Sequence, residues 1–175
     1  MWFLLFYGDR MAIRSLILVV LLVVLTSVSA QACFGPKLFV GAGQGVQSDA
    51  LFALITLYIQ EKTGVESTRV EIEEGQNPLD LISSEKADLV LVLADESPDG
   101  VTLYKNAVFH IEGLPLLMTG KRPLDDLQFT TVLPAIRKLN RLLKYEQFAR
   151  LVSRIDAGES AMAVARKFFM ERRWI

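Results

Sequence analysis

The sequence contains a single cysteine and a single histidine among its 175 residues. One cysteine cannot form a disulfide within the chain, so a folded domain must depend on its apolar core. The commoner zinc sites need several Cys and His ligands and are excluded. His110 lies in the apolar run VFHI with no serine or cysteine nearby, so no nucleophile, base and orienting group can be assembled around it. We therefore predict no catalytic residues, no metal and no cofactor, and not an enzyme.

An excess of positive charge is also missing. The chain has 19 basic and 20 acidic residues, and its basic residues form no stripe before the C-terminal segment. Nucleic-acid-binding domains usually carry a basic patch or stripe, so we predict no nucleic-acid partner. Repeats and low-complexity tracts are absent as well, which leaves an ordinary globular domain as the expectation.

The first 32 residues have the pattern of a secretory signal peptide. Starting at Met11, a short basic segment with Arg14 precedes the aliphatic run LILVVLLVVL, and a small polar stretch ends in the A-x-A pattern at Ala30 to Ala32. The apolar run is about half of the ~20 residues that a membrane-spanning helix needs. Residues 1–10 include Asp9, which is atypical of such a leader. We predict a signal peptide over 1–32, with Met11 as the true start, and a periplasmic or otherwise exported domain over 33–175.

Cys33 would be the first residue of the exported chain, and two interpretations remain for it. Bacterial lipoproteins begin at a lipid-modified cysteine, which would give the chain a lipid anchor. The residues before Cys33 are a poor match to the usual lipoprotein cleavage site, and the alternative is a plain terminal thiol. Removing residues 1–32 leaves a net charge of about −2, because two basic residues and one acidic residue are lost.

Residues 37–93 predict a β-α-β-α-β unit. The expected strands are 37–41, 69–73 at an edge, and the continuously apolar 88–93. The first helix is expected over 50–63, with Ser48 or Asp49 as its cap, one apolar face and Gly64 as its end. The second is expected to start at Asn77 and run to about Lys86. Such alternation is typical of an α/β domain with a mostly parallel sheet.

The rest of the mature chain is less regular at first and then helical. Residues 95–100 form a turn cluster, 101–111 are one strand or two, and 114–118 are a short buried segment. Three helices are expected over 133–143, 145–155 and 160–172, with Gly158 as the break between the last two.

The C-terminal pattern resembles that of one known family. It comprises FTTVLPAIRKL from Phe129, FARLVSRID from Phe148, VARKFF from Val164 and the closing RWI. These segments, together with LFVG from Leu38 and the helix ending in KTG, resemble the substrate-binding proteins of glycine betaine and osmoprotectant ABC transporters. The resemblance implies one lobe of a type II periplasmic binding protein: a three-layer α-β-α domain with the C-terminal helices packed on it.

The chain departs from that family in two respects. Family members are about twice as long and close two lobes over a ligand, whereas the link from Asp95 to Leu114 is too short for a second lobe. A cage of aromatic side chains for a quaternary cation is also not visible. Tyr58 is expected in the core and Tyr145 at a helix start, which leaves only Tyr104 as a ligand contact.

Ligands of α/β domains bind beyond the carboxyl ends of the strands. The polar residues expected there follow the three predicted strands, and Tyr104 joins them from the link; the predicted ligand-binding set is Gln44, Gln47, Ser48, Gln76, Asp95, Glu96 and Tyr104. The glycine-bearing loop from Gly41 to Gly45 could bind a carboxylate, although turn geometry accounts for its glycines equally well.

Three functions stay open at this point. The first is a solute-binding protein for a small polar or zwitterionic solute, with an ABC permease as its partner. The second is a periplasmic module that keeps the scaffold but contacts another envelope protein. The third and most distant is a small enzyme that uses Asp95 and Glu96 as acid and base. A homodimer of two such lobes would restore a cleft.

Overall fold

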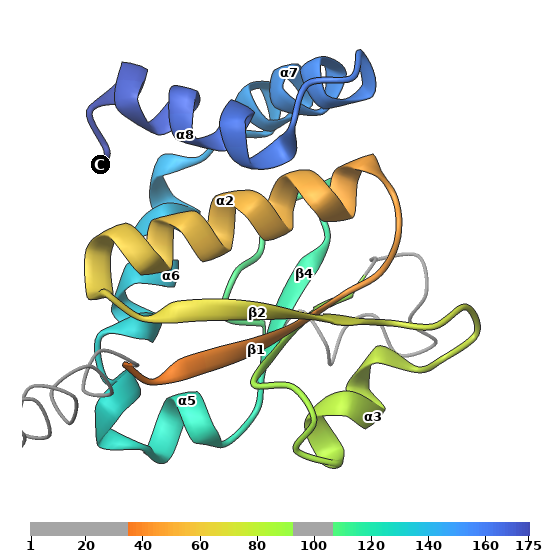
Figure 1. The fold of residues 1–175 in the computed structure, drawn as a ribbon, viewed down its shortest axis with the longest axis vertical. Coiled ribbons are helices and arrows are strands. Elements are labelled where there is room, and N and C mark those ends of the chain that lie inside the picture. Colours follow the sequence, from red (N-terminus) through yellow and green to blue (C-terminus); the bar gives the residue numbers. More distant parts are fainter. Residues whose placement is uncertain (1–34, 93–106) are drawn as a thin grey trace, which may run out of the picture. The chain divides into compact units, whose positions relative to one another are not determined.

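The computed structural model describes residues 35–92 and 107–175, and Gly35–Ile175 forms one compact unit. Its strands and helices follow in the order shown in Figure 1. The elements are β1 (Lys37–Ala42), α2 (Val46–Thr63), β2 (Glu66–Glu71), α3 (Pro78–Ser83), β3 (Leu89–Val92), β4 (Leu116–Thr119), α5 (Arg122–Asp125), the 3-10 helix η3 (Leu127–Phe129), α6 (Val132–Leu142), α7 (Tyr145–Asp156) and α8 (Ala161–Arg172).

The described strands form one sheet in the order β2-β1-β3-β4. β1 pairs in parallel with both β2 and β3, and β4 returns antiparallel to β3, with Leu116 opposite Val92. The predicted α/β class with a mostly parallel sheet is therefore confirmed, as is the edge position of β2. β2 begins and ends earlier than the predicted 69–73, because its pairing with β1 starts at Glu66 opposite Lys37.

The alternation of side chains along β1 divides the core between the two faces of the sheet. Leu38, Val40 and Ala42 point into the larger cluster, which also contains α2 and α6. On the other face Gly41 lies under α3, where a Cβ atom would come 3.2 Å from Cδ1 of Leu81 and 3.0 Å from Cγ2 of Val90. The absence of a side chain at residue 41 is what lets α3 approach the sheet.

Helix α2 is buried on all sides, which corrects the prediction of a single apolar face. Its buried residues run almost without interruption from Ala50 to Ile59. The reason is tertiary: the sheet covers one side of α2, and α7 and α8 pack along it on the side away from the sheet (Figure 1). A helix that is apolar all round needs such cover on both sides. The C-terminal pair thus adds a further layer to the predicted three.

Local signals mark most helix ends. Asn77 caps α3, since its Oδ1 accepts a hydrogen bond from the backbone N–H of Leu79 at 3.1 Å, and Pro78 is the first helical residue, as predicted. Gly64 ends α2 in the left-handed conformation, and Gly158, with φ of 98°, separates α7 from α8. α3 ends at Ser83, before the predicted Lys86.

Two further predictions need correction. Helix α2 starts at Val46 with Gly45 at its cap position, so Ser48 and Asp49 lie inside the helix. Within the described part of 101–111, Phe109 makes only an isolated bridge to Leu117 and His110 is in no strand.

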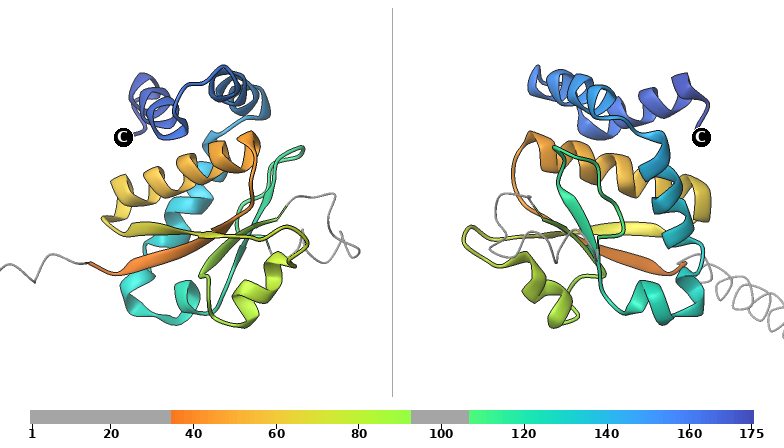
Figure 2. Two further views of the ribbon diagram at one scale, coloured as in Figure 1. Left: turned by 45° about the vertical axis from the view of Figure 1, so that its right-hand side comes forward. Right: turned by 180° about the vertical axis from the view of Figure 1, so that it is seen from behind.

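Seen from behind, α6 runs beside the sheet and leads to α7 (Figure 2). In the described ranges, no helix has both the length and the apolar character that a membrane crossing requires.

Candidate ligand-binding edge of the sheet

The carboxyl ends of β1 and β3 form a topological switch point. From β1 the chain crosses through α2 to β2 on one side, and from β2 it crosses back through α3 to β3 on the other side of β1. The connection through α2 thus leads from β1 to its neighbour on one side, the connection through α3 leads to its neighbour on the other side, and the strand order reverses between β1 and β3. In open α/β sheets this is the place where ligands bind.

The first turn of α2 faces this switch point. The loop from Gly43 to Gly45 connects β1 directly to α2, and Gly45 takes a φ of 113° that residues with a side chain rarely adopt. Among the residues that the structure describes, no side chain caps the helix start. The unsatisfied N–H groups of a helix N-terminus and its partial positive charge favour an anion.

Arg69 fixes this loop and the helix start to β2. One Nη donates to the carbonyl oxygen of Gly43 at 2.6 Å, and the other lies 2.6 Å from Oδ1 of Asp49 in the first turn of α2. Its guanidinium lies over the ring of Phe52, 5.2 Å from the centroid, and its Nε is 2.9 Å from a carboxylate oxygen of Glu71. The Arg69 side chain is only 24% exposed, so these contacts to the loop and the helix start are largely shielded from solvent.

Gln44 and Gln47 occupy the edge as predicted: both are exposed, one in the loop and one in the first turn of α2. Ser48, the third residue of α2, is only 6% exposed, and its role as a ligand contact stays a prediction. Gln76 serves a local role in the loop after β2, where its Oε1 accepts a hydrogen bond from the N–H of Glu73 at 3.1 Å. Cys33, Asp95, Glu96 and Tyr104 lie outside the described residues.

A surface hollow of about 340 Å³ lies at the same edge and is lined by His110 to Leu114. These residues form the turn before β4, in which the N–H of Leu114 donates to the carbonyl of Ile111 at 3.0 Å and Gly113 has φ of 80°. Asn140 of α6 holds the turn by accepting from the N–H of His110 at 2.9 Å. The position at the start of β4, beside the end of β3, is what makes this hollow part of the edge.

Sequence reasoning missed the Arg69 network and a second one at the opposite, amino edge of the sheet. There the buried Asp88 accepts from the N–H of Phe39 at 2.7 Å, and its other oxygen lies 3.0 Å from Nε of Arg122. Arg122 also lies over the rings of Phe39 and Phe129 and donates to the carbonyl of Lys37. The sequence did contain a signal for Asp88, since this charged residue stands at the start of a strand and directly before an apolar run.

Within residues 35–92 and 107–175, no cluster of three or more His, Cys, Asp or Glu side chains could hold a metal ion. Comparisons with protein-family models, with curated proteins and with solved structures found no match to this chain. The resemblance to osmoprotectant-binding proteins thus remains a prediction from the sequence.

Proposed function

We propose that this chain is an exported solute-binding protein of reduced size, resembling one lobe of a type II periplasmic binding protein, and that it binds a small zwitterionic solute such as a betaine. The single observation that carries the proposal is the α2 N-terminus, which has no side-chain cap in the described residues and faces the switch point between β1 and β3. A carboxylate of the solute would accept hydrogen bonds from the backbone N–H groups there.

The charges around the helix start are compatible with an anionic group. Asp49 lies in the first turn and would by itself repel a carboxylate, but Arg69 contacts it at 2.6 Å and offsets its charge. Gln44 and Gln47 are exposed, neutral and able to donate hydrogen bonds. The site therefore combines backbone donors with two amide side chains and no uncompensated carboxylate from the first turn of α2.

A weak affinity follows from the architecture of the proposal. A binding protein with two lobes buries most of its solute, whereas a single edge covers only one side of it, and well-formed ligand pockets bury about 70–90% of a small ligand. We therefore expect dissociation constants in the range from micromolar to millimolar for the isolated domain, and tighter binding only where a second chain closes over the edge.

Calorimetry with glycine betaine and choline tests the proposal, because the two share the trimethylammonium group and only betaine has a carboxylate. We expect heat from betaine, proline betaine or carnitine and none from choline.

Gln47→Glu places a negative charge in the first turn of α2, where it should weaken betaine binding about tenfold by repulsion while leaving helix stability unchanged or slightly raised.

Gln60→Glu is the matched control, since it makes the same change on an exposed residue in the last turn of α2. It should lower stability slightly and leave betaine binding unchanged. Equal binding of betaine and choline, or no heat from any member of the set, would contradict the proposal.

A second function, a periplasmic protein-interaction module, is favoured by one observation. Leu124 is 56% exposed and Leu127 is 85% exposed on the short segment after β4. Contact surfaces for other proteins gather exposed apolar side chains of this kind into one patch. This alternative would be favoured if no solute gave heat in the calorimetry and if one envelope protein bound the chain at these leucines.

A further inference from the structure

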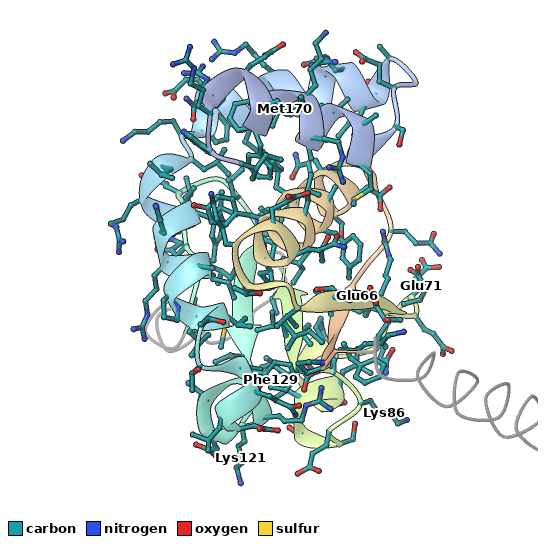
Figure 3. The ribbon with its side chains drawn as sticks, turned by 60° about the vertical axis from the view of Figure 1, so that its left-hand side comes forward. Glu66, Glu71, Lys86, Lys121, Phe129 and Met170 are labelled. Atoms are coloured by element: carbon teal, nitrogen blue, oxygen red, sulfur yellow. The ribbon has the colours of Figure 1, made fainter. Side chains whose placement is uncertain are left out.

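Helix α6 has an outward face on which every long side chain is positively charged. Its exposed residues are Pro134, Arg137, Lys138 and Arg141, and they lie within an arc of about 100° around the helix axis. The inward face packs on α2 and includes the fully buried Ile136. In Figure 3 nitrogen-tipped side chains project from the outer side of this helix. The three cations, 137, 138 and 141, are called the α6 stripe from here on.

The charge of the α6 stripe is not balanced by nearby carboxylates. Residues 127–145 contain four basic residues and no Asp or Glu. Among the residues that the structure describes, no member of the stripe forms an ion pair. By contrast, Arg154 of α7 pairs with Glu159, and Arg166 of α8 pairs with Glu61. The stripe is therefore a region of uncompensated positive charge.

The spacing of these cations works against the helix that carries them. Arg141 is four residues from Arg137 and three from Lys138, so like charges lie on adjacent turns, which destabilises a helix. Arg141 is in the last turn, where the helix dipole favours a cation. Arg137 and Lys138 lie in the middle of α6, where the dipole gives no such compensation. An external anionic surface would remove this repulsion.

A surface of uniform negative charge matches the stripe better than a protein surface does. Protein interfaces usually have an apolar centre, and none of the exposed large apolar side chains of the described residues belongs to α6. Anionic bilayers, by contrast, attract clusters of Lys and Arg through charge alone. The three cations span only about 6 Å along the helix axis, so their long side chains can reach one flat surface together.

We propose that the α6 stripe binds the headgroups of an anionic phospholipid bilayer, with α6 lying along the membrane surface. The contact is electrostatic and peripheral, and no side chain enters the apolar interior. Three charges give weak, reversible binding that salt screens. This contact goes beyond the proposed solute binding and is independent of it, because Gln44 and Gln47 lie on the loop and helix that follow β1.

Co-sedimentation of residues 33–175 with lipid vesicles tests this inference. This segment contains the compact unit Gly35–Ile175 with its apolar core. It omits the apolar run at 16–25, which would bind to bilayers regardless of their charge. We expect binding to vesicles of phosphatidylcholine with about 40% phosphatidylglycerol and none to pure phosphatidylcholine. Added salt should weaken the binding.

Two double variants that lose the same charges locate the contact. Arg137→Gln with Lys138→Gln removes one Arg and one Lys from the stripe, and the affinity for anionic vesicles should fall about tenfold. Arg150→Gln with Lys167→Gln removes one Arg and one Lys from exposed positions of α7 and α8. These helices form the layer that carries Met170 in Figure 3, and the affinity of this control should stay within about twofold of the unmodified chain. Thermal unfolding should be unchanged in the control and unchanged or slightly later in the stripe variant.

Three results with vesicles would overturn the inference: binding to neutral and anionic vesicles alike, no binding to either, or equal losses in the two double variants. An acidic peptide or a short DNA duplex that binds the stripe more tightly than the vesicles do would also overturn it, because the partner would then be a different polyanion. Betaine calorimetry on the same preparations keeps this test separate from the proposed function, since neither double variant should change betaine binding.

Discussion

At the scale of single residues, Tyr58 is the clearest case of a group that the core holds at a cost. It is 1% exposed in α2, its ring centroid is 5.5 Å from that of Phe169, and its hydroxyl is buried without a hydrogen-bond partner in the described residues. Burial raises the pKa of Tyr58, and the positive charge of Arg141 lowers it to a smaller degree. We predict that Tyr58→Phe leaves the free energy of unfolding unchanged or raises it by about 1 kcal/mol at neutral pH.

The pH dependence of the free energy of unfolding provides a second test of the buried Tyr58 hydroxyl. Because the pKa in the folded state is above the ordinary value of 10.0, the stability contribution of Tyr58 is complete below pH 10 and is lost as the pH rises further. Urea unfolding from pH 8 to 11 should therefore show a steeper alkaline loss for the wild type than for Tyr58→Phe. Parallel curves for the two proteins would contradict a raised pKa.

At the scale of elements, the seating of α3 on the sheet depends on Gly41. A Cβ there would lie 3.0 Å from a methyl carbon of Val90 and 3.2 Å from a methyl carbon of Leu81, so these side chains must give way by a few tenths of an ångström. We predict that Gly41→Ala costs about 1–3 kcal/mol in the free energy of unfolding, as overpacked core sites do. Gly43→Ala is the matched control: no atom lies within 4 Å of its Cβ position, and urea midpoints should change little. A similar loss for both variants would count against close packing as the cause.

At the scale of the whole molecule, the described unit depends on its C-terminal helices to cover α2. Phe169 is fully buried and lies against Tyr58 and Trp174, so α8 closes the same core that the sheet begins. We predict that Phe169→Ala lowers the free energy of unfolding by about 3–5 kcal/mol. The exposed neighbour Met170→Ala should change it by less than about 0.5 kcal/mol.

The measurement is urea unfolding of residues 33–175, followed both by the fluorescence of Trp174 and by far-UV circular dichroism. The two transitions should coincide in the wild type, because α2 cannot stay folded once α8 leaves it. An earlier transition of Trp174 alone would mean that the C-terminal helices unfold independently.

The sequence by itself determined the class of the fold and the order of its main strands and helices, because those follow from local chemistry. The apolar run of β3, the Asn77-Pro78 start of α3 and the Gly64 and Gly158 breaks each act over a few residues. Gln44 and Gln47 could be predicted at the edge, since the carboxyl ends of parallel strands meet there. These signals need no knowledge of what lies across the fold.

Tertiary structure alone decided what each side chain faces. Ser48 looked like a helix cap and lies inside α2, because the helix begins at Val46, four residues before the predicted start. α2 looked amphipathic and is covered on both sides, because α7 and α8 pack on it from residues 145–172. Arg69 contacts Asp49 and Gly43, 20 and 26 residues away, through the pairing of β2 with β1. Contacts at such separation depend on the register of the sheet, which no local pattern encodes.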